Sequence, residues 1–153
     1  MHHSPQSLQI LLERAEAERD AAQARAARAA ELVQQLAQQA EQLLAYRDEY
    51  RRRAPATGAQ AAHIQLVRSH RDFMQRLDQA MEQQHGQREA AEHDAAVQRE
   101  ALLELEQRVA SVRKLLERRQ AQQRQHATRA EQRRSDEAAQ RGAWARRGTG
   151  HGH

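Results

Sequence analysis

The sequence contains no cysteine, which excludes a disulfide framework and thiolate chemistry. Two prolines and six glycines among 153 residues are too few for a loop-rich or disordered chain. Aromatic residues make up 3% of the chain, and the hydrophobic 39% contains many alanines, which leaves too little bulky side chain for a globular core. No apolar run approaches the roughly 20 residues that span a bilayer. The composition therefore favours long helices, each buried along one stripe of its surface.

The residues that are present support helix formation. Charged residues make up 30% of the chain, and most of the others are Ala, Gln and Leu, which are good helix formers. Residues 1–6 lack a basic segment followed by an apolar one, so no secretory signal is expected and a cytosolic location is the default.

Helix-breaking residues occur at few positions. Ser4 and Pro5 are typical of a helix start, Pro55 and Gly58 mark a turn, and the next break comes only at Gly142. We therefore predict an all-α single domain over residues 1–147, followed by a flexible tail over 148–153. Its parts are a first helix near 5–54, a turn near 55–59 and a second helix near 60–141.

Heptad spacing predicts how the two helices pair. Both helices carry two columns of mostly apolar residues at coiled-coil spacing. The columns face each other if the chain folds back at Gly58, so we predict an antiparallel coiled-coil hairpin. The columns are Leu8, Ala15, Ala22, Ala29, Leu36, Leu43, Tyr50; Leu12, Arg19, Ala26, Val33, Ala40, Arg47; Val67, Met74, Met81, Arg88, Ala95, Leu102, Val109, Leu116; and His70, Leu77, Gln84, Ala91, Gln98, Leu105, Val112, Arg119.

The pattern also predicts a weak middle and an unpaired end. Ala22 faces Ala95 in this register, and Gly86 interrupts the second helix nearby, so we expect the middle to bend. The apolar columns stop at Leu116, so the second helix is expected to overhang the first. Residues 117–147 hold nine arginines and four acidic residues, a charge suited to an acidic protein surface, a phosphate backbone or an anionic membrane.

Signals for an enzyme or a cofactor are absent. The few glycines form no phosphate-binding loop, and no cofactor or small-molecule substrate is expected. The nine histidines lack the spacing of a rigid ligand set, so no metal site is predicted. Nucleic-acid binding by the basic residues stays a lesser alternative, because Trp144 is the only aromatic residue among them.

One stripe beside the seam is a candidate binding surface. Phe73, Leu77, Ala80 and Gln84 follow one another at helical spacing after the turn. Two interpretations are open: Phe73 widens the packed seam against Tyr46 and Tyr50, or it belongs to an exposed apolar patch that docks a partner.

Three segments stand out: residues 43–51, LLAYRDEYR, before the turn; residues 73–83, FMQRLDQAMEQ, after it; and residues 131–141, EQRRSDEAAQR, near the C-terminus. They resemble, in this order, the Tyr-x-x-Glu-Tyr segment, the Phe…Leu…Ala-Ile-x-x-Gln stretch and the basic segment ending in Asp-Glu-x-Ala-x-Arg of the FliJ family. Members of that family are the small coiled-coil components of the flagellar type III export apparatus. The segments occur in family order and cover most of the chain.

The resemblance implies a non-enzymatic stalk with defined partners. These are the hexameric flagellar export ATPase, the cytoplasmic domain of the transmembrane export gate, and export chaperones; no nucleic acid is implied. Carried over by position, the gate is met by Phe73, Leu77, Ala80 and Gln84, and the ATPase by Arg133, Arg134, Asp136, Glu137 and Arg141. A cytoplasmic location, peripheral to the inner-membrane export apparatus, is implied. An injectisome-type stalk and a generic coiled-coil tether stay open as alternatives.

Overall fold

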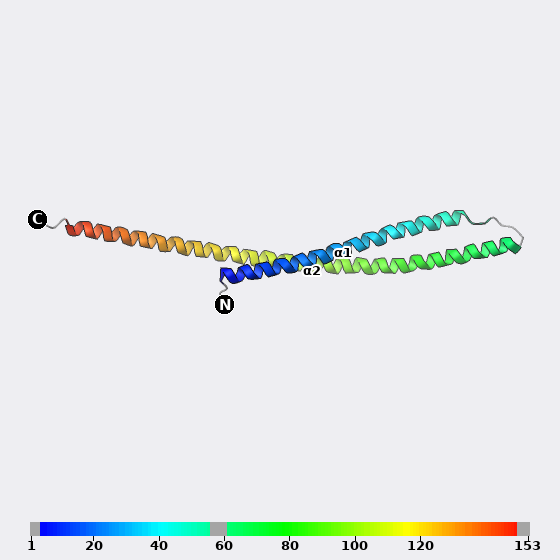
Figure 1. The fold of residues 1–153 in the computed structure, drawn as a ribbon, viewed down its shortest axis with the longest axis horizontal. Coiled ribbons are helices and arrows are strands. Elements are labelled where there is room, and N and C mark those ends of the chain that lie inside the picture. The colour runs from blue at the N-terminus through cyan, green and yellow to red at the C-terminus, as the bar shows by residue number, and fades with distance from the viewer. Residues whose placement is uncertain (1–3, 56–60, 150–153) are drawn as a thin grey trace. The chain divides into compact units, whose positions relative to one another are not determined.

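The computed structural model describes residues 4–55 and 61–149, and within these ranges it contains two helices and no strand. Helix α1 spans Pro5–Arg52 and helix α2 spans Ala61–Thr149. Figure 1 shows them in chain order, α1 from blue to cyan and α2 from green to red. The all-α prediction is confirmed. The predicted turn at 55–59 lies, apart from Pro55, outside the described residues.

Both ends of α1 follow from local chemistry. Ser4 precedes the helix, its hydroxyl oxygen accepts a hydrogen bond from the Ser7 backbone N–H at 3.2 Å, and Pro5 takes the first helical position. At the other end, the N–H groups of Arg53 and Ala54 donate to carbonyls three residues back. These tightened turns lie just before Pro55, which disfavours helical backbone at the residue before it.

Helix α2 continues past its predicted end at 141 to Thr149. Glycine inside a helix costs only about 1 kcal/mol relative to alanine, and Gly142 is followed by Ala143, Trp144 and Ala145, which tolerate helical backbone. The Thr149 hydroxyl donates to the carbonyl of Arg146 at 3.0 Å, which satisfies an acceptor that the last turn leaves open.

The chain divides into two compact units, each containing a segment of both helices. The terminal unit holds the described residues of 1–17 and 107–153, and the central unit holds those of 18–106. The single-domain organisation stays a prediction.

The terminal unit has an aliphatic core. Leu8, Leu12 and Ala15 of α1 are buried together with Val109 and Leu116 of α2, and Val112 packs against this cluster. Full burial of one Leu or Val side chain stabilises a fold by about 1.5–3 kcal/mol. An exposed ion pair between Glu16 and Arg113, at 3.2 Å, lies beside the cluster.

The central unit pairs the helices in antiparallel order. His70 contacts Tyr50, Asp78 contacts Arg47, and Gln84 contacts Leu36, so partners in α2 advance while those in α1 recede. Every described member of the four predicted columns, in either unit, is buried or half-buried. The predicted seam is therefore confirmed.

Alanine supplies much of the buried seam in the central unit. Ala22, Ala29, Ala91 and Ala95 are buried, and Ala22 is only 1% exposed. Such small side chains allow the helices to approach closely, but each buries little area. The bending of this segment stays a prediction.

Candidate protein-binding surfaces

An aromatic cluster surrounds Phe73 in the central unit. The Phe73 ring centroid lies 4.3 Å from that of Tyr50 and 6.2 Å from that of Tyr46, which meets it edge-on. The imidazole of His70 stacks on Tyr50 at 4.8 Å, and its Nε2 lies 2.9 Å from the Tyr50 carbonyl oxygen. Phe73 is half-buried. Of the two interpretations, the structure therefore favours packing of Phe73 against the tyrosines.

The other three residues of the predicted gate-facing stripe do not share one environment. Leu77 is buried, whereas Ala80 is exposed. Gln84 is 9% exposed, and its side-chain amide donates a hydrogen bond of 2.6 Å to the carbonyl oxygen of Leu36 in α1. Gln84 and Leu77 thus lie in the seam, while Phe73 and Ala80 border it. Binding of a gate by these residues stays a prediction.

The inward position of Gln84 had a signal in the sequence. Gln84 falls in the same heptad column as His70, Leu77 and Ala91, all of which are buried or half-buried. That column predicted contact with α1, whereas the stripe from Phe73 predicted contact with a partner. No sequence pattern indicates that the Gln84 amide donates to the backbone carbonyl of Leu36.

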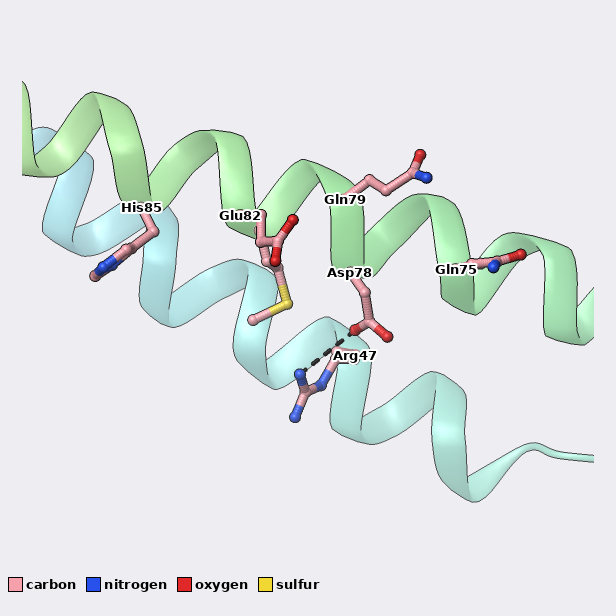
Figure 2. A pocket seen from close by; sticks show the side chains of 7 residues that line it. Arg47, Gln75, Asp78, Gln79, Glu82 and His85 are labelled. Atoms are coloured by element: carbon pink, nitrogen blue, oxygen red, sulfur yellow. Dashed lines mark hydrogen bonds and ion pairs between the residues drawn. The ribbon is translucent and has the colours of Figure 1, made fainter.

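On the opposite border of the seam, polar side chains line a shallow hollow. Figure 2 shows Arg47 of α1 and Asp78 of α2 pointing toward each other, joined by an ion pair of 3.5 Å. Met81, Glu82 and His85 continue the lining along α2. His85 pairs with Glu89 at 3.0 Å, and both side chains are exposed. Ion pairs this exposed contribute about 0–1 kcal/mol each, so the hollow is a surface feature rather than a source of stability.

The basic arm, which we define as residues 117–149, is the second candidate surface. From Gln120 onward every described residue is exposed except Ala130 and Gly142, which are half-buried. The five residues predicted to meet the ATPase lie exposed on this helix, within about two and a half turns. Glu137 pairs with Arg141 at 3.8 Å, and the Gln132 amide donates to Asp136 at 3.5 Å. Their role in binding stays a prediction. The predicted five are Arg133, Arg134, Asp136, Glu137 and Arg141.

One exposed residue of the arm was not among the predicted site residues. Trp144 is 77% exposed and, with Glu137, Gln140 and Arg141, lines a small notch. In the sequence it stood out only as the single aromatic residue of a basic segment.

Within residues 4–55 and 61–149, no group of three or more His, Asp or Glu residues is placed to hold a metal ion. No helix in the same ranges is both long enough and apolar enough to cross a membrane.

The fold and these surfaces define a two-helix antiparallel coiled-coil protein that presents an aromatic cluster in one unit and a basic helical arm in the other. The chain belongs to the FliJ family: the family described as Flagellar FliJ protein matches residues 4–148, nearly its whole length. Comparison with curated proteins and with solved structures gave no match. Family membership makes the chain a structural component of flagellar protein export.

Proposed function

We propose that the protein is a non-enzymatic stalk that binds the hexameric flagellar export ATPase through the basic arm and couples it to the export gate. The observation that carries this proposal is the arm itself. Helix α2 has 89 residues and α1 has 48, so α2 cannot pair with α1 along its whole length. A long exposed helical segment with a basic face is what a surrounding partner would grip.

The polar and basic side chains of the arm favour a polar partner surface over an apolar helix. The seam column that holds Val109 and Leu116 continues at seven-residue spacing into Gln123 and Ala130, and its companion continues from Val112 into Arg119. Burial of apolar side chains cannot attach a face with these residues to another helix, and an exposed polar helix is only marginally stable by itself. Contact with a protein surface that offers acidic and polar groups would stabilise it.

The aromatic cluster supports a second contact in the central unit. Phe73 is held by Tyr50, Leu77 and Gln84 are fixed in the seam, and Ala80 is exposed. In this proposal Phe73 and Ala80 touch the cytoplasmic domain of the gate, and the two buried residues position them. Export chaperones are further partners, and the protein works in the cytoplasm at the periphery of the inner-membrane export apparatus.

The ATPase contact is tested by ATP hydrolysis of the flagellar export ATPase, with and without this protein, at near-physiological salt. The full chain should stimulate hydrolysis, and a chain truncated after Leu116 should not. Stimulation by both forms would move the contact out of the arm. No effect from either folded form would reject the ATPase stalk in favour of a generic tether, which predicts that partner binding survives removal of the arm.

A pair of charge reversals locates the contact more finely. Arg133→Glu should lower stimulation, whereas Arg124→Glu should leave it unchanged. The two arginines are exposed and nine residues apart, so they lie two and a half turns apart on opposite sides of α2. Equal loss in both variants would indicate attraction by net charge rather than a face of the arm.

The gate contact is tested at Ala80, because arginine there adds bulk without removing a packed side chain. Ala80→Arg should abolish binding of the gate's cytoplasmic domain while thermal unfolding stays unchanged. Ala90→Arg, at another exposed alanine of α2, is the matched control. Retained binding in Ala80→Arg would reject this surface.

A further inference from the structure

Trp144 is the only tryptophan of the chain and is 77% exposed on the basic arm. Residues three apart on a helix are surface neighbours, so Arg141 and Arg147 lie on either side of the indole. Gln140 and Gly148 are its neighbours at four residues, and a Cβ added at Gly148 would meet no atom within 4 Å. Trp144 therefore lies between two arginine positions on one face of the helix, with open space at Gly148.

The last part of the arm carries charge of one sign. No Asp or Glu occurs from Ala138 to Thr149, whereas Arg141, Arg146 and Arg147 fall within this range. Arg141 pairs with Glu137 at 3.8 Å, and the two side chains are 79% and 64% exposed. An exposed pair four residues apart on a helix contributes about 0.3–0.5 kcal/mol, so Arg141 can exchange it for another carboxylate at little cost.

A second copy of this surface is a poor occupant. Trp144 continues the column of Val109 and Leu116, and Arg133 and Arg147 continue that of Val112. A symmetric antiparallel pair of arms centred on Arg133 would place Arg119 opposite Arg147 and Arg133 opposite itself. Like charges at such positions repel. The complementary partner is acidic.

We infer that Trp144, Arg141 and Arg147 form an anchor for an acidic protein surface that holds an apolar socket for the indole. This inference rests on the proposed function, and it specifies the chemistry of the ATPase surface that the arm would contact. Tryptophan and arginine are the residues that most often dominate interface affinity when a partner desolvates them. The guanidinium groups on either side suit carboxylates, which they bind in bidentate geometry.

The experiment uses the full chain with 5-hydroxytryptophan at position 144, a probe that can be excited apart from any tryptophan of the ATPase. Titration with the purified export ATPase should shift its emission to the blue and protect it from acrylamide. Trp144→Ala should weaken binding by about 30-fold or more, the effect of a dominant interface residue. Arg147→Ala should weaken binding as well. Arg146→Ala is the matched control, because Arg146 lies two residues from Trp144 and faces away from it.

Three outcomes overturn the inference. If the ATPase binds the chain but the probe is unchanged and Trp144→Ala binds equally well, the anchor is rejected and the proposed function stands. If the ATPase does not bind at all, the proposed function fails and the anchor with it. If duplex DNA or vesicles of anionic lipid shift the probe at lower concentration than the ATPase, the surface recognises phosphate groups and not an acidic protein.

Discussion

Helix α2 carries one heptad pattern through two chemically different regions. Up to Leu116 the seam columns hold residues that are buried or half-buried against α1, such as Leu77, Ala95 and Val109. Beyond Arg119 their members are exposed apart from the half-buried Ala130, as at His126, Arg133 and Glu137. The backbone is helical throughout. Helical backbone and burial are thus separate properties here: propensity is enough for the helix, whereas apolar columns are needed for pairing.

This difference between the paired and the exposed region of α2 has a consequence for partner binding under the proposed function. A paired helix buries its apolar columns against its partner, which leaves the borders of the seam, as at Ala80, and the outer face for other contacts. An unpaired helix offers all its sides, and its specificity comes from charge and from single anchors such as Trp144. The two regions are therefore expected to respond very differently to substitution.

The largest effect is expected in the aliphatic cluster. Leu12→Ala should lower the free energy of unfolding by about 3 kcal/mol, because a buried leucine loses its contacts and leaves a cavity. Leu11→Ala, at the neighbouring and exposed leucine, should cost less than about 1 kcal/mol. Denaturant unfolding followed by circular dichroism measures both. Equal effects at the two positions would show that the cluster is not the core of its unit.

A smaller loss is expected at Gln84, a buried polar residue of the seam. Gln84→Ala should lower the free energy of unfolding by about 2 kcal/mol, because the hydrogen bond to the Leu36 carbonyl and the packing of the side chain are both lost. Gln83→Ala, on the exposed face, should change it little. Gln84→Leu separates the two contributions: stability equal to the natural chain would show that the hydrogen bond adds nothing net.

A gain is expected where α2 carries an internal glycine. Gly86→Ala should raise the free energy of unfolding by up to about 1 kcal/mol, since alanine is the better helix former. A Cβ at this position meets no atom within 4 Å, so no clash offsets the gain. Thermal unfolding of the pair of proteins gives the result. A lower melting temperature would mean that the glycine serves a local bend rather than merely being tolerated.

The smallest effect is expected in the arm. Arg133→Ala should change the free energy of unfolding by less than about 0.5 kcal/mol, because the side chain is exposed. ATPase stimulation by the same variant should nevertheless fall. A clear loss of stability would instead assign Arg133 a role in packing, and would remove the contrast between the two regions of α2.

Much of the fold was predictable because its signals are local or periodic. Pro5 and Pro55 mark the start and the end of α1, and the heptad columns identified the seam and the antiparallel register. The end of α2 was not predictable from Gly142, since one glycine weakens a helix without ending it. The sequence left Phe73 between two interpretations because its neighbours, Tyr46 and Tyr50, lie in the other helix and are brought to it only by pairing.

The candidate sites were less predictable. Heptad position indicates that Gln84 faces α1, but only the structure identifies the Leu36 carbonyl as its acceptor. Trp144 falls on the column of Val109 and Leu116, but the polar residues between them hide that position in the sequence. Its environment emerges only once the helix is known to continue past Gly142.

The spacing of paired residues along the chain also orders the events of folding. The contact of His70 with Tyr50 spans 20 residues, that of Gln84 with Leu36 spans 48, and that of Arg113 with Glu16 spans 97. The entropy lost on closing a loop rises with its length, so pairing is easiest to begin near Tyr50 and proceeds by zipping. On the ribosome, Leu8 and Leu12 are made early, but their buried partners Val109 and Leu116 emerge about a hundred residues later. At about 5–20 residues per second, the aliphatic stripe of α1 is left uncovered for several seconds, an interval in which a nascent-chain chaperone could bind it.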